Sequence, residues 1–235
     1  KLVFEVRDIW PLTLVEDGKF SWNNPLIKFL ALIERFGYKF SDLIVGTMPK
    51  LDVHVKKVMG YSKSVKCIPM GFDPDILNKM EDINHEYIDQ FLKPNDFNVI
   101  YAGTIGISNA LEVFFKAADI LKSEAKLNFV VIGDGPLKQE YIKKYSHLKN
   151  LIFAPKINKN QVQTALSYAS VLFFSVHKSN LFQYGQSLNK VIDYMASKKP
   201  IIACYCGHQS MINESNCGYF VPAEDAQKLV DKIRE

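Results

Sequence analysis

The stretch from Phe97 to Pro136 reads FNVIYAGTIGISNALEVFFKAADILKSEAKLNFVVIGDGP. It holds an apolar strand pattern at Phe97–Ala102, a helical pattern at Ala110–Ser123 and a second strand pattern at Leu127–Ile132. A strand, a helix and another strand in this order predict a βαβ unit with a parallel sheet. Because the strands are nearly continuous in apolar residues, we expect the sheet to be covered on both faces.

The same alternation continues on both sides of this stretch. Before it we predict strands at Lys1–Val6, Asp42–Gly46 and Ser64–Met70, and helices at Pro25–Phe40 and Pro49–Met59. After it we predict helices at Leu137–Tyr145, Asn160–Tyr168, Ser187–Ser197, Ser210–Glu214 and Glu224–Glu235, and strands at Leu151–Phe153, Val171–Val176, Pro200–Ala203 and Gly218–Val221. Residues 73–96 are charged and without a clear period, which indicates a linker that contains a helix. We therefore expect one parallel-sheet domain over 1–72, a second over 97–221 and a terminal helix over 222–235.

Composition excludes several classes of protein. Of the 235 residues 48% are hydrophobic and 23% are charged, as in ordinary globular domains, and no apolar run is long enough to span a membrane. The four cysteines are too few and too scattered for a disulfide framework, so we expect free thiols in a reducing cytosol. The net charge of +4 lies in residues 1–72, which hold 11 lysines and arginines against seven acidic residues. This basic part either faces an anionic surface or is an ordinary solvated face.

Two glycine turns each follow a strand and precede a helix. Gly103–Gly106 and Gly133–Pro136 bring backbone N–H groups to a helix start, where a phosphate can bind. Either turn can equally be a tight connection without a ligand. The spacing is not GxGxxG, so a dinucleotide-binding fingerprint is not supported.

The segment FQYGQSLNKVIDYMASKKP, Phe182–Pro200, runs from a polar loop into a helix. Gln186 or Ser187 can cap this helix. Lys190 stands in the first turn, where a cation is unfavourable beside the positive end of the helix dipole unless an anion lies between. Asp193 follows on the same face and can accept hydrogen bonds from sugar hydroxyls. The alternative for Lys190 and Asp193 is a surface ion pair.

The histidines are not clustered, and no pair has the spacing of metal ligands, so we expect no metal. We expect His54, His85 and His147 to be solvated. His177 and His208 follow predicted strands and are candidates for lining a cleft.

Six motifs occur in the order found in family 4 retaining glycosyltransferases of the GT-B fold, and the chain resembles that family over nearly its whole length. They are Ser41–Thr47, Ile68–Asp73, Gly103–Gly106, Gly133–Pro136, Asp193–Ile202 and Cys217–Asp225. Arg7–Pro11 and Ser187–Lys190 resemble the branch that builds bacterial surface polysaccharides, including O-antigen and capsule.

The resemblance implies a fold of two Rossmann-like parallel-sheet domains with a cleft between them. It implies that the first domain is incomplete, with roughly a hundred further residues before Lys1 and a short helical tail after Glu235. The implied function is transfer of a sugar from a nucleotide diphosphate sugar, in particular a UDP-sugar, to a hydroxyl of a lipid-linked saccharide acceptor. The resemblance further implies that the transferred sugar retains its anomeric configuration and that the protein acts in polysaccharide biosynthesis.

The resemblance also implies a site. Lys190, Asp8 and Arg7 take the catalytic positions. The donor-binding positions are Gly103, Thr104, Asn109, Lys156, Ile157, Tyr184, Gln186, Ser187, Leu188, Asn189 and Asp193. No cofactor or metal is expected, because helix dipoles and a cation can hold the diphosphate. For Arg7 and Asp8 the alternative is a structural ion pair, and for Lys156 and Ile157 a plain connecting loop.

Two departures from the family affect this interpretation. The first glutamate of the donor motif falls on Gly185, and the cations that clamp the diphosphate fall on Thr104 and about Asn109, which are neutral. Lys190 can supply the missing cation. The departures leave two alternatives open: a non-catalytic GT-B partner that binds only nucleotide or membrane, and a UDP-sugar epimerase of the same fold.

The resemblance implies a cytoplasmic protein. It also implies peripheral contact with the inner face of the cytoplasmic membrane, and we expect no nucleic-acid partner. The predicted helix Pro25–Phe40 is amphipathic and basic. Its apolar face lies either on a lipid surface or on the sheet of its own domain.

Overall fold

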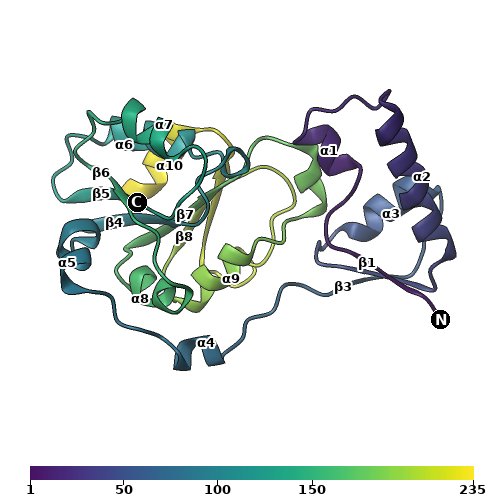
Figure 1. Ribbon diagram of the computed structural model, residues 1–235, viewed down its shortest axis with the longest axis horizontal. Helices are drawn as coiled ribbons and strands as arrows, with labels where there is room; N and C mark the ends of the chain where they lie inside the picture. Colours follow the sequence, from purple (N-terminus) through teal and green to yellow (C-terminus); the bar gives the residue numbers. More distant parts are fainter. The chain divides into compact units, whose positions relative to one another are not determined.

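The computed structural model describes all 235 residues, which form two compact units (Figure 1). The smaller unit combines Lys1–Gly71 with Ser179–Leu188 and Cys206–Ser210, and the larger unit holds the remaining segments. The predicted boundaries place 179–188 and 206–210 in the second domain, and no local pattern signals their return to the smaller unit. Residues 73–96, predicted as a linker with a helix, carry three short helices and belong to the larger unit.

The smaller unit is built on a three-stranded parallel sheet in the order β1-β2-β3. Val3 pairs with Leu43 and Gly46 with Cys67. Its elements are β1 (Val3–Val6), α1 (Leu12–Glu16), α2 (Pro25–Phe40), β2 (Leu43–Gly46), α3 (Leu51–Met59), β3 (Val65–Cys67) and the 3-10 turn η4 (Asn180–Tyr184). The short helix α1 is not predicted from the sequence, because it spans barely more than one turn.

Helix α2 has the predicted bounds, and its start has clear local signals. The Asn24 side chain accepts a hydrogen bond from the backbone N–H of Leu26 at 2.9 Å, and Pro25 takes the first helical position. Ile27, Glu34 and Tyr38 form its buried side. Tyr38 packs in the core of the unit, which also contains Ile44.

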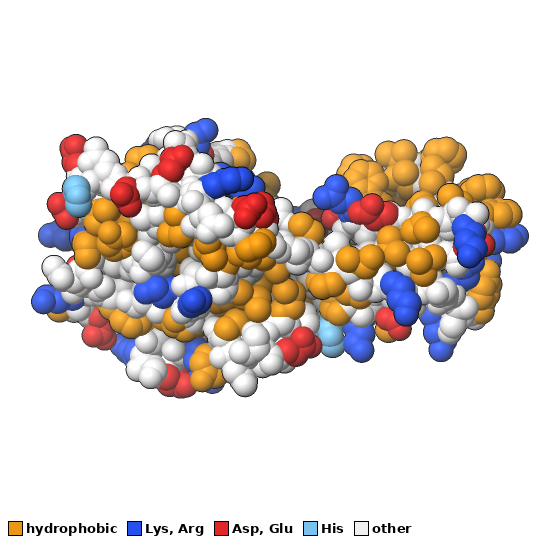
Figure 2. Space-filling model, turned by 90° about the horizontal axis from the view of Figure 1, so that it is seen from below, with side chains coloured by type: hydrophobic (Ala, Val, Ile, Leu, Met, Phe, Trp, Pro, Cys, Tyr) orange, Lys and Arg blue, Asp and Glu red, His pale blue; other side chains and the backbone are white.

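The opposite side of α2 is both apolar and exposed. Its exposed large apolar residues are Leu26, Phe29, Leu32, Ile33, Phe36 and Phe40. Most of the predicted apolar face therefore does not lie on the sheet of this unit, and only Leu30 of that face is half-buried. Figure 2 shows hydrophobic side chains gathered on the part of the molecule that carries α2.

The larger unit contains a six-stranded parallel sheet in the order β6-β5-β4-β7-β8-β9. Its strands are β4 (Phe97–Ala102), β5 (Leu127–Ile132), β6 (Leu151–Ala154), β7 (Val171–Ser175), β8 (Ile201–Tyr205) and β9 (Gly218–Pro222). Its α-helices are α4 (Asp75–Asn78), α5 (His85–Tyr87), α6 (Glu112–Ile120), α7 (Lys138–Lys144), α8 (Val162–Ser167), α9 (Asn189–Ala196) and α10 (Ala226–Arg234). The π-helix η1 (Ile88–Leu92) and the 3-10 turns η2 (Ile107–Asn109) and η3 (Lys159–Gln161) complete it.

Helices cover both faces of this sheet, with α6, α7 and α10 on one side and α8 and α9 on the other (Figure 1). Phe114 of α6 stacks on Phe173 of β7 at 4.7 Å between ring centroids and meets Phe129 of β5 edge-on at 5.0 Å. The continuous apolar strands thus predict the two-sided burial correctly. The helix predicted over 210–214 is wrong, because that segment forms turns in which Met211 has a positive φ.

Candidate functional site

The two glycine turns lie side by side at the carboxyl edge of the larger sheet, where β4 and β5 end. The Gly103 N–H donates to the Ile132 carbonyl at 3.0 Å, and the Ile105 N–H donates to the Asp134 carbonyl at 2.8 Å. A Cβ added at Gly133 would lie only 2.0 Å from the Gly103 carbonyl oxygen. Glycine is therefore required at Gly133 by the close approach of the two backbones.

Helix α9 is attached to the same edge through Tyr194, which is buried. Its hydroxyl accepts a hydrogen bond from the Ala102 N–H at 2.8 Å and donates to the Ala102 carbonyl at 3.2 Å. Because Lys190 stands one turn before Tyr194, this anchor brings the lysine to the first glycine turn. A Cβ on Gly103 would lie 3.5 Å from the Lys190 Nζ.

The Lys190 ammonium contacts neutral groups only. Its Nζ donates to the Tyr101 hydroxyl at 3.1 Å and to the Asn109 Oδ1, and lies 4.6 Å from the centroid of the Tyr101 ring. Burial lowers the pKa of Lys190 to about 8, and no carboxylate forms an ion pair with it. A partly buried cation without an acidic partner is an arrangement that suits a bound anion.

Neighbouring groups hold this arrangement in place. The Tyr101 hydroxyl donates to the Thr104 carbonyl at 2.6 Å, and the Asn109 Nδ2 donates to the same oxygen at 3.0 Å. The Ser175 hydroxyl at the end of β7 donates to the Asn109 carbonyl at 2.7 Å. The structure therefore brings together four of the predicted site residues, which are Gly103, Thr104, Asn109 and Lys190.

Asp193 lies on α9 and is half-buried. Burial raises the pKa of its carboxyl group, while the charge of Lys159 opposes the shift. The carboxylate accepts no hydrogen bond from the protein and does not pair with Lys190, so the alternative of a surface ion pair between them is wrong. An unpaired, half-buried carboxylate is available to hydroxyl donors of a ligand.

The loop after β6 holds the predicted residues Lys156, which is exposed, and Ile157, which is half-buried. The Lys138 ammonium donates to the carbonyl groups of Gly133 and Ala154 at 2.7 and 2.9 Å. The base of this loop is thereby joined to the second glycine turn.

The loop before α9 lies in the smaller unit. Tyr184 is buried there, and its ring meets that of His54 edge-on at 5.0 Å. The side-chain amide of Gln186 and the hydroxyl of Ser187 are buried without a hydrogen-bond partner, so neither forms the predicted cap. Leu188 is half-buried and Asn189 is exposed at the first position of α9. Such orphaned polar groups are uncommon in folded proteins.

Gly185 occupies the position of the family's first glutamate for a structural reason. Its φ is +97°, and an added Cβ would lie 2.5 Å from the Pro49 ring. A glutamate at this position would need a different backbone path, so the departure from the family is built into the loop.

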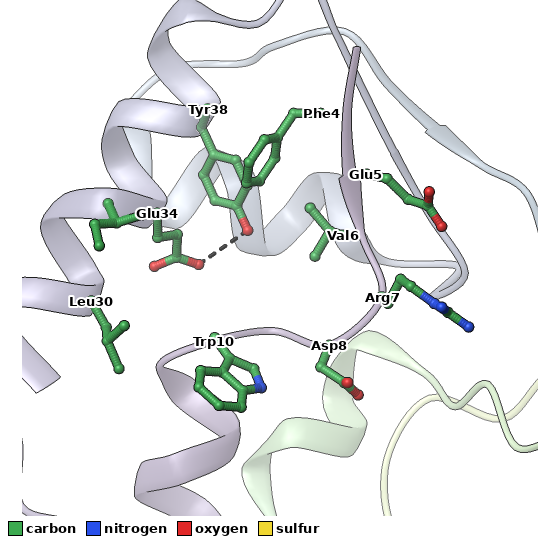
Figure 3. Close-up of a pocket in the computed structure, with 10 residues that line it drawn as sticks. Phe4, Glu5, Val6, Arg7, Asp8, Trp10, Leu30, Glu34 and Tyr38 are labelled. Atoms are coloured by element: carbon green, nitrogen blue, oxygen red, sulfur yellow. Dashed lines mark hydrogen bonds between the residues drawn. The ribbon is translucent and has the colours of Figure 1, made fainter.

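Arg7 and Asp8 follow β1 in the smaller unit, and both are exposed. They do not pair with each other, which excludes the alternative of a structural ion pair. Both belong to the lining of a cavity of about 220 Å³ between β1 and α2 (Figure 3).

One polar cluster of the smaller unit was not predicted from the sequence. His54 is only 5% exposed, so its predicted solvation is wrong, and its Nε2 lies 2.6 Å from the Glu34 Oε1. The Tyr38 hydroxyl donates to the same oxygen at 3.0 Å. A charged residue within the buried stripe of α2 is the only sequence signal for this cluster. Of the other candidates, His177 contacts the Ile107 carbonyl at 2.6 Å, and His208 lies in the smaller unit.

No three histidine, cysteine or acidic side chains lie together in a group that could hold a metal ion. No helix is long and apolar enough to cross a membrane.

A family model described as "Glycosyl transferases group 1" matches residues 96–235, which is more than half of the chain. The chain therefore belongs to the group 1 glycosyl transferases. The matched residues include both glycine turns, Lys190 and Asp193. No curated protein sequence matches the chain.

Solved structures of low sequence identity share the fold. Sucrose-phosphate synthase from Thermosynechococcus elongatus is 16% identical, with a TM-score of 0.69 over 99% of this chain and 57% of that one. HepE from Anabaena, in complex with UDP-glucose, is 15% identical, with a TM-score of 0.67 over 100% of this chain and 62% of that one. WaaG, a glycosyltransferase involved in lipopolysaccharide biosynthesis, is 15% identical, with a TM-score of 0.68 over 99% of this chain and 64% of that one.

These matches confirm the predicted GT-B type of parallel-sheet α/β fold. The chain spans about 60% of the length of these three structures.

Proposed function

We propose that this protein transfers a sugar from a UDP-sugar to an acceptor hydroxyl, with retention of configuration, as a family 4 member of the group 1 glycosyl transferases. The observation that carries the proposal is the Lys190 ammonium, held at the first glycine turn by Tyr101 and Asn109 without an acidic partner. Family membership supports sugar transfer, and the UDP-glucose complex of the Anabaena protein supports the choice of nucleotide.

In this proposal the diphosphate binds between the glycine turn and the start of α9. Lys190 and the first N–H groups of the helix neutralise it, so no metal ion or cofactor is required. The leaving phosphate acts as the base for attack on the same face of the sugar, and the protein stabilises the charge that develops on that phosphate. The Asp193 carboxylate accepts hydrogen bonds from the ribose hydroxyls, and the loop with Lys156 and Ile157 meets the base.

The remaining predicted residues keep supporting roles. The orphaned amide of Gln186 and hydroxyl of Ser187 are donors and acceptors for the nucleotide sugar. Arg7 and Asp8 stand on the acceptor side. Tyr184 is packed in the core of its unit, so we assign it a structural contribution to the loop that carries Gln186.

The test is calorimetric titration of the whole chain with UDP, followed by turnover with a panel of UDP-sugars. Lys190→Met removes the charge while keeping a similar length, and it should weaken UDP binding by about tenfold or more, as expected for a charge-assisted contact. Lys149→Met is the matched control. That lysine is exposed and precedes the start of β6, so it lies at the amino edge of the sheet, away from the glycine turns. Equal affinities of the two variants and the parent would contradict the proposal.

One alternative retains support from a specific feature. Gly185 leaves no room for the family's first glutamate, which favours a partner subunit that binds nucleotide without catalysis. UDP binding together with an absence of turnover on every UDP-sugar and acceptor would select this alternative. An epimerase would instead interconvert UDP-sugars without an acceptor.

We further propose that the acceptor is lipid-linked, that the product is a surface polysaccharide, and that α2 meets an anionic membrane surface from the cytoplasmic side. The exposed apolar face of α2 is flanked by the exposed cations Lys28, Arg35 and Lys39. Such a face suits the acyl boundary and anionic headgroups of a bilayer.

Flotation with anionic vesicles should therefore occur at low salt and fade as salt rises, because salt screens the surface attraction. Replacing Phe29 and Phe36 by serine should abolish flotation. Val53→Ser, at another exposed apolar position, on α3, should not. Equal flotation of all three proteins would exclude α2 as the contact.

A further inference from the structure

The segment 81–84, which leads into α5, is fastened to η3 and α8 of the larger unit. The Thr164 hydroxyl donates to the Glu81 carbonyl at 2.7 Å, and the Asn160 Nδ2 donates to the Glu81 carboxylate at 3.0 Å. Ile83 is buried. Because the two donors stand 83 and 79 residues away along the chain, tertiary packing and not the local sequence gives this segment its place.

This fastened segment brings Tyr87 to the loop after β6. The Asn84 side chain caps α5 by accepting a hydrogen bond from the Glu86 N–H at 2.9 Å, and Tyr87 is the last residue of that helix. The Tyr87 hydroxyl donates to the Pro155 carbonyl at 2.8 Å, and its ring packs on the Phe91 ring at 4.9 Å between centroids. Burial raises the pKa of Tyr87 to about 12, so the hydroxyl keeps its proton and remains a donor at neutral pH.

A second side chain holds the same loop. The Lys138 ammonium donates to the carbonyl of Ala154, the residue before Pro155, at 2.9 Å. Two consecutive carbonyl groups of the loop are thus occupied, and Pro155 has no N–H to offer. The backbone groups of the next two residues, Lys156 and Ile157, have no hydrogen-bond partner in the protein. The loop is therefore fixed where it leaves β6 and presents the open backbone of two residues.

We propose that Tyr87 is a positioning residue for the base of the nucleotide, an inference that rests on the proposed function. By holding the Pro155 carbonyl, its hydroxyl sets the place of the open backbone groups of Lys156 and Ile157. Hydrogen bonds weaken steeply when their angle is poor, so a base is recognised well only by backbone groups that are already in place. Ordering a loop during binding costs affinity, and the Tyr87 contact removes part of that cost.

The variant Tyr87→Phe isolates this role, because it removes the hydroxyl and keeps the ring on Phe91. Calorimetry on the whole chain would compare the affinities for UDP, ADP and inorganic pyrophosphate. Pyrophosphate carries the diphosphate without a base, so it reports on the Lys190 site alone. Tyr87→Phe should weaken UDP binding about fivefold, as expected for one hydrogen bond, and leave pyrophosphate binding unchanged. The preference for UDP over ADP should shrink by the same factor.

Tyr145→Phe is the matched control. Tyr145 is half-buried like Tyr87, and its ring lies 4.8 Å from that of Phe115. Its hydroxyl donates to the Glu112 carboxylate, so the control variant loses a contact between α7 and α6 instead of one with the loop after β6. It should bind all three ligands as the parent does. Circular dichroism would verify that both variants are folded.

Three results would overturn the inference. They are UDP affinity that Tyr87→Phe leaves unchanged, an equal loss of UDP and pyrophosphate affinity, and a parent protein that binds UDP and ADP equally well. Failure of the proposed function has a different signature. A parent protein that binds no UDP refutes the proposed function and this inference together, whereas UDP binding that is insensitive to Tyr87→Phe refutes this inference alone.

Discussion

At Lys190 the demands of stability and of the proposed ligand binding oppose each other. A lysine in the first turn of α9 faces the positive end of the helix dipole, and burial lowers its pKa to about 8, well below the value in the unfolded chain. Folding therefore disfavours the charged form, and this penalty is largest at low pH and is relieved as pH rises through 8 and toward the unfolded pKa. We predict that Lys190→Met raises the melting temperature at neutral pH while it weakens UDP binding. A lower melting temperature would show that the ammonium stabilises the fold.

The same lowered pKa predicts the pH dependence of ligand binding. Lys190 loses its proton as pH rises through about 8, so the affinity for UDP should fall between pH 7 and pH 9, by about fivefold to tenfold. Calorimetry across this range measures the effect. Lys190→Met should bind UDP weakly and without this pH dependence, and a variant that keeps the full dependence would assign the titration to another group.

Asp193 differs from Lys190 because its carboxylate has no partner in the protein. Asp193→Ala should weaken UDP binding by about 1–3 kcal/mol, since it removes charge-assisted bonds to hydroxyl groups. Thermal stability should stay the same or rise, because burial already disfavours the charged form. Asp193→Glu should weaken UDP binding only slightly. Unchanged affinity of Asp193→Ala in calorimetry would remove this residue from the site.

At the scale of the element, the two glycine turns act as one structure. A methyl group at Gly133 would lie 2.0 Å from the Gly103 carbonyl oxygen, so Gly133→Ala must separate the turns. We predict a loss of about 1–3 kcal/mol in the free energy of unfolding, as for other overpacked sites, with a parallel loss of UDP affinity. Urea unfolding and calorimetry give the two values.

Gly106→Ala is the control within the first turn. Its φ of −139° suits any residue, and the nearest atom to an added Cβ is the Thr104 Cγ2 at 3.8 Å. This variant should unfold and bind as the parent does. Equal stability of Gly133→Ala and Gly106→Ala would mean that the backbones need not approach so closely.

At the scale of the whole molecule, each unit has its own core. Both tryptophans lie in the smaller unit, so their emission follows that unit alone, whereas far-ultraviolet circular dichroism follows both. We predict that UDP at about 100 times its Kd stabilises the larger unit by about 2.7 kcal/mol and shifts the dichroism transition, with a smaller shift in tryptophan emission. Identical shifts by both probes would show that the units unfold together.

Local pattern was sufficient for most of the fold. The bounds of α2, β4 and β5 follow from the sequence because apolar period, capping and turn residues agree there. The prediction for the segment 210–214 is wrong because Met211 adopts a positive φ, which few sequence signals reveal. The six ordered motifs were enough to identify the glycosyltransferase fold.

What the sequence determined by itself is therefore the parallel α/β architecture, the two glycine turns and the position of Lys190 at a helix start. Only the tertiary structure decided that Lys190 contacts Tyr101 and Asn109 instead of Asp193, since these partners are 89 and 81 residues away along the chain. The burial of His54 against Glu34 and the exposure of the apolar side of α2 were decided in the same way. Periodicity shows that a helix has faces, but the packing of distant segments determines which face is buried.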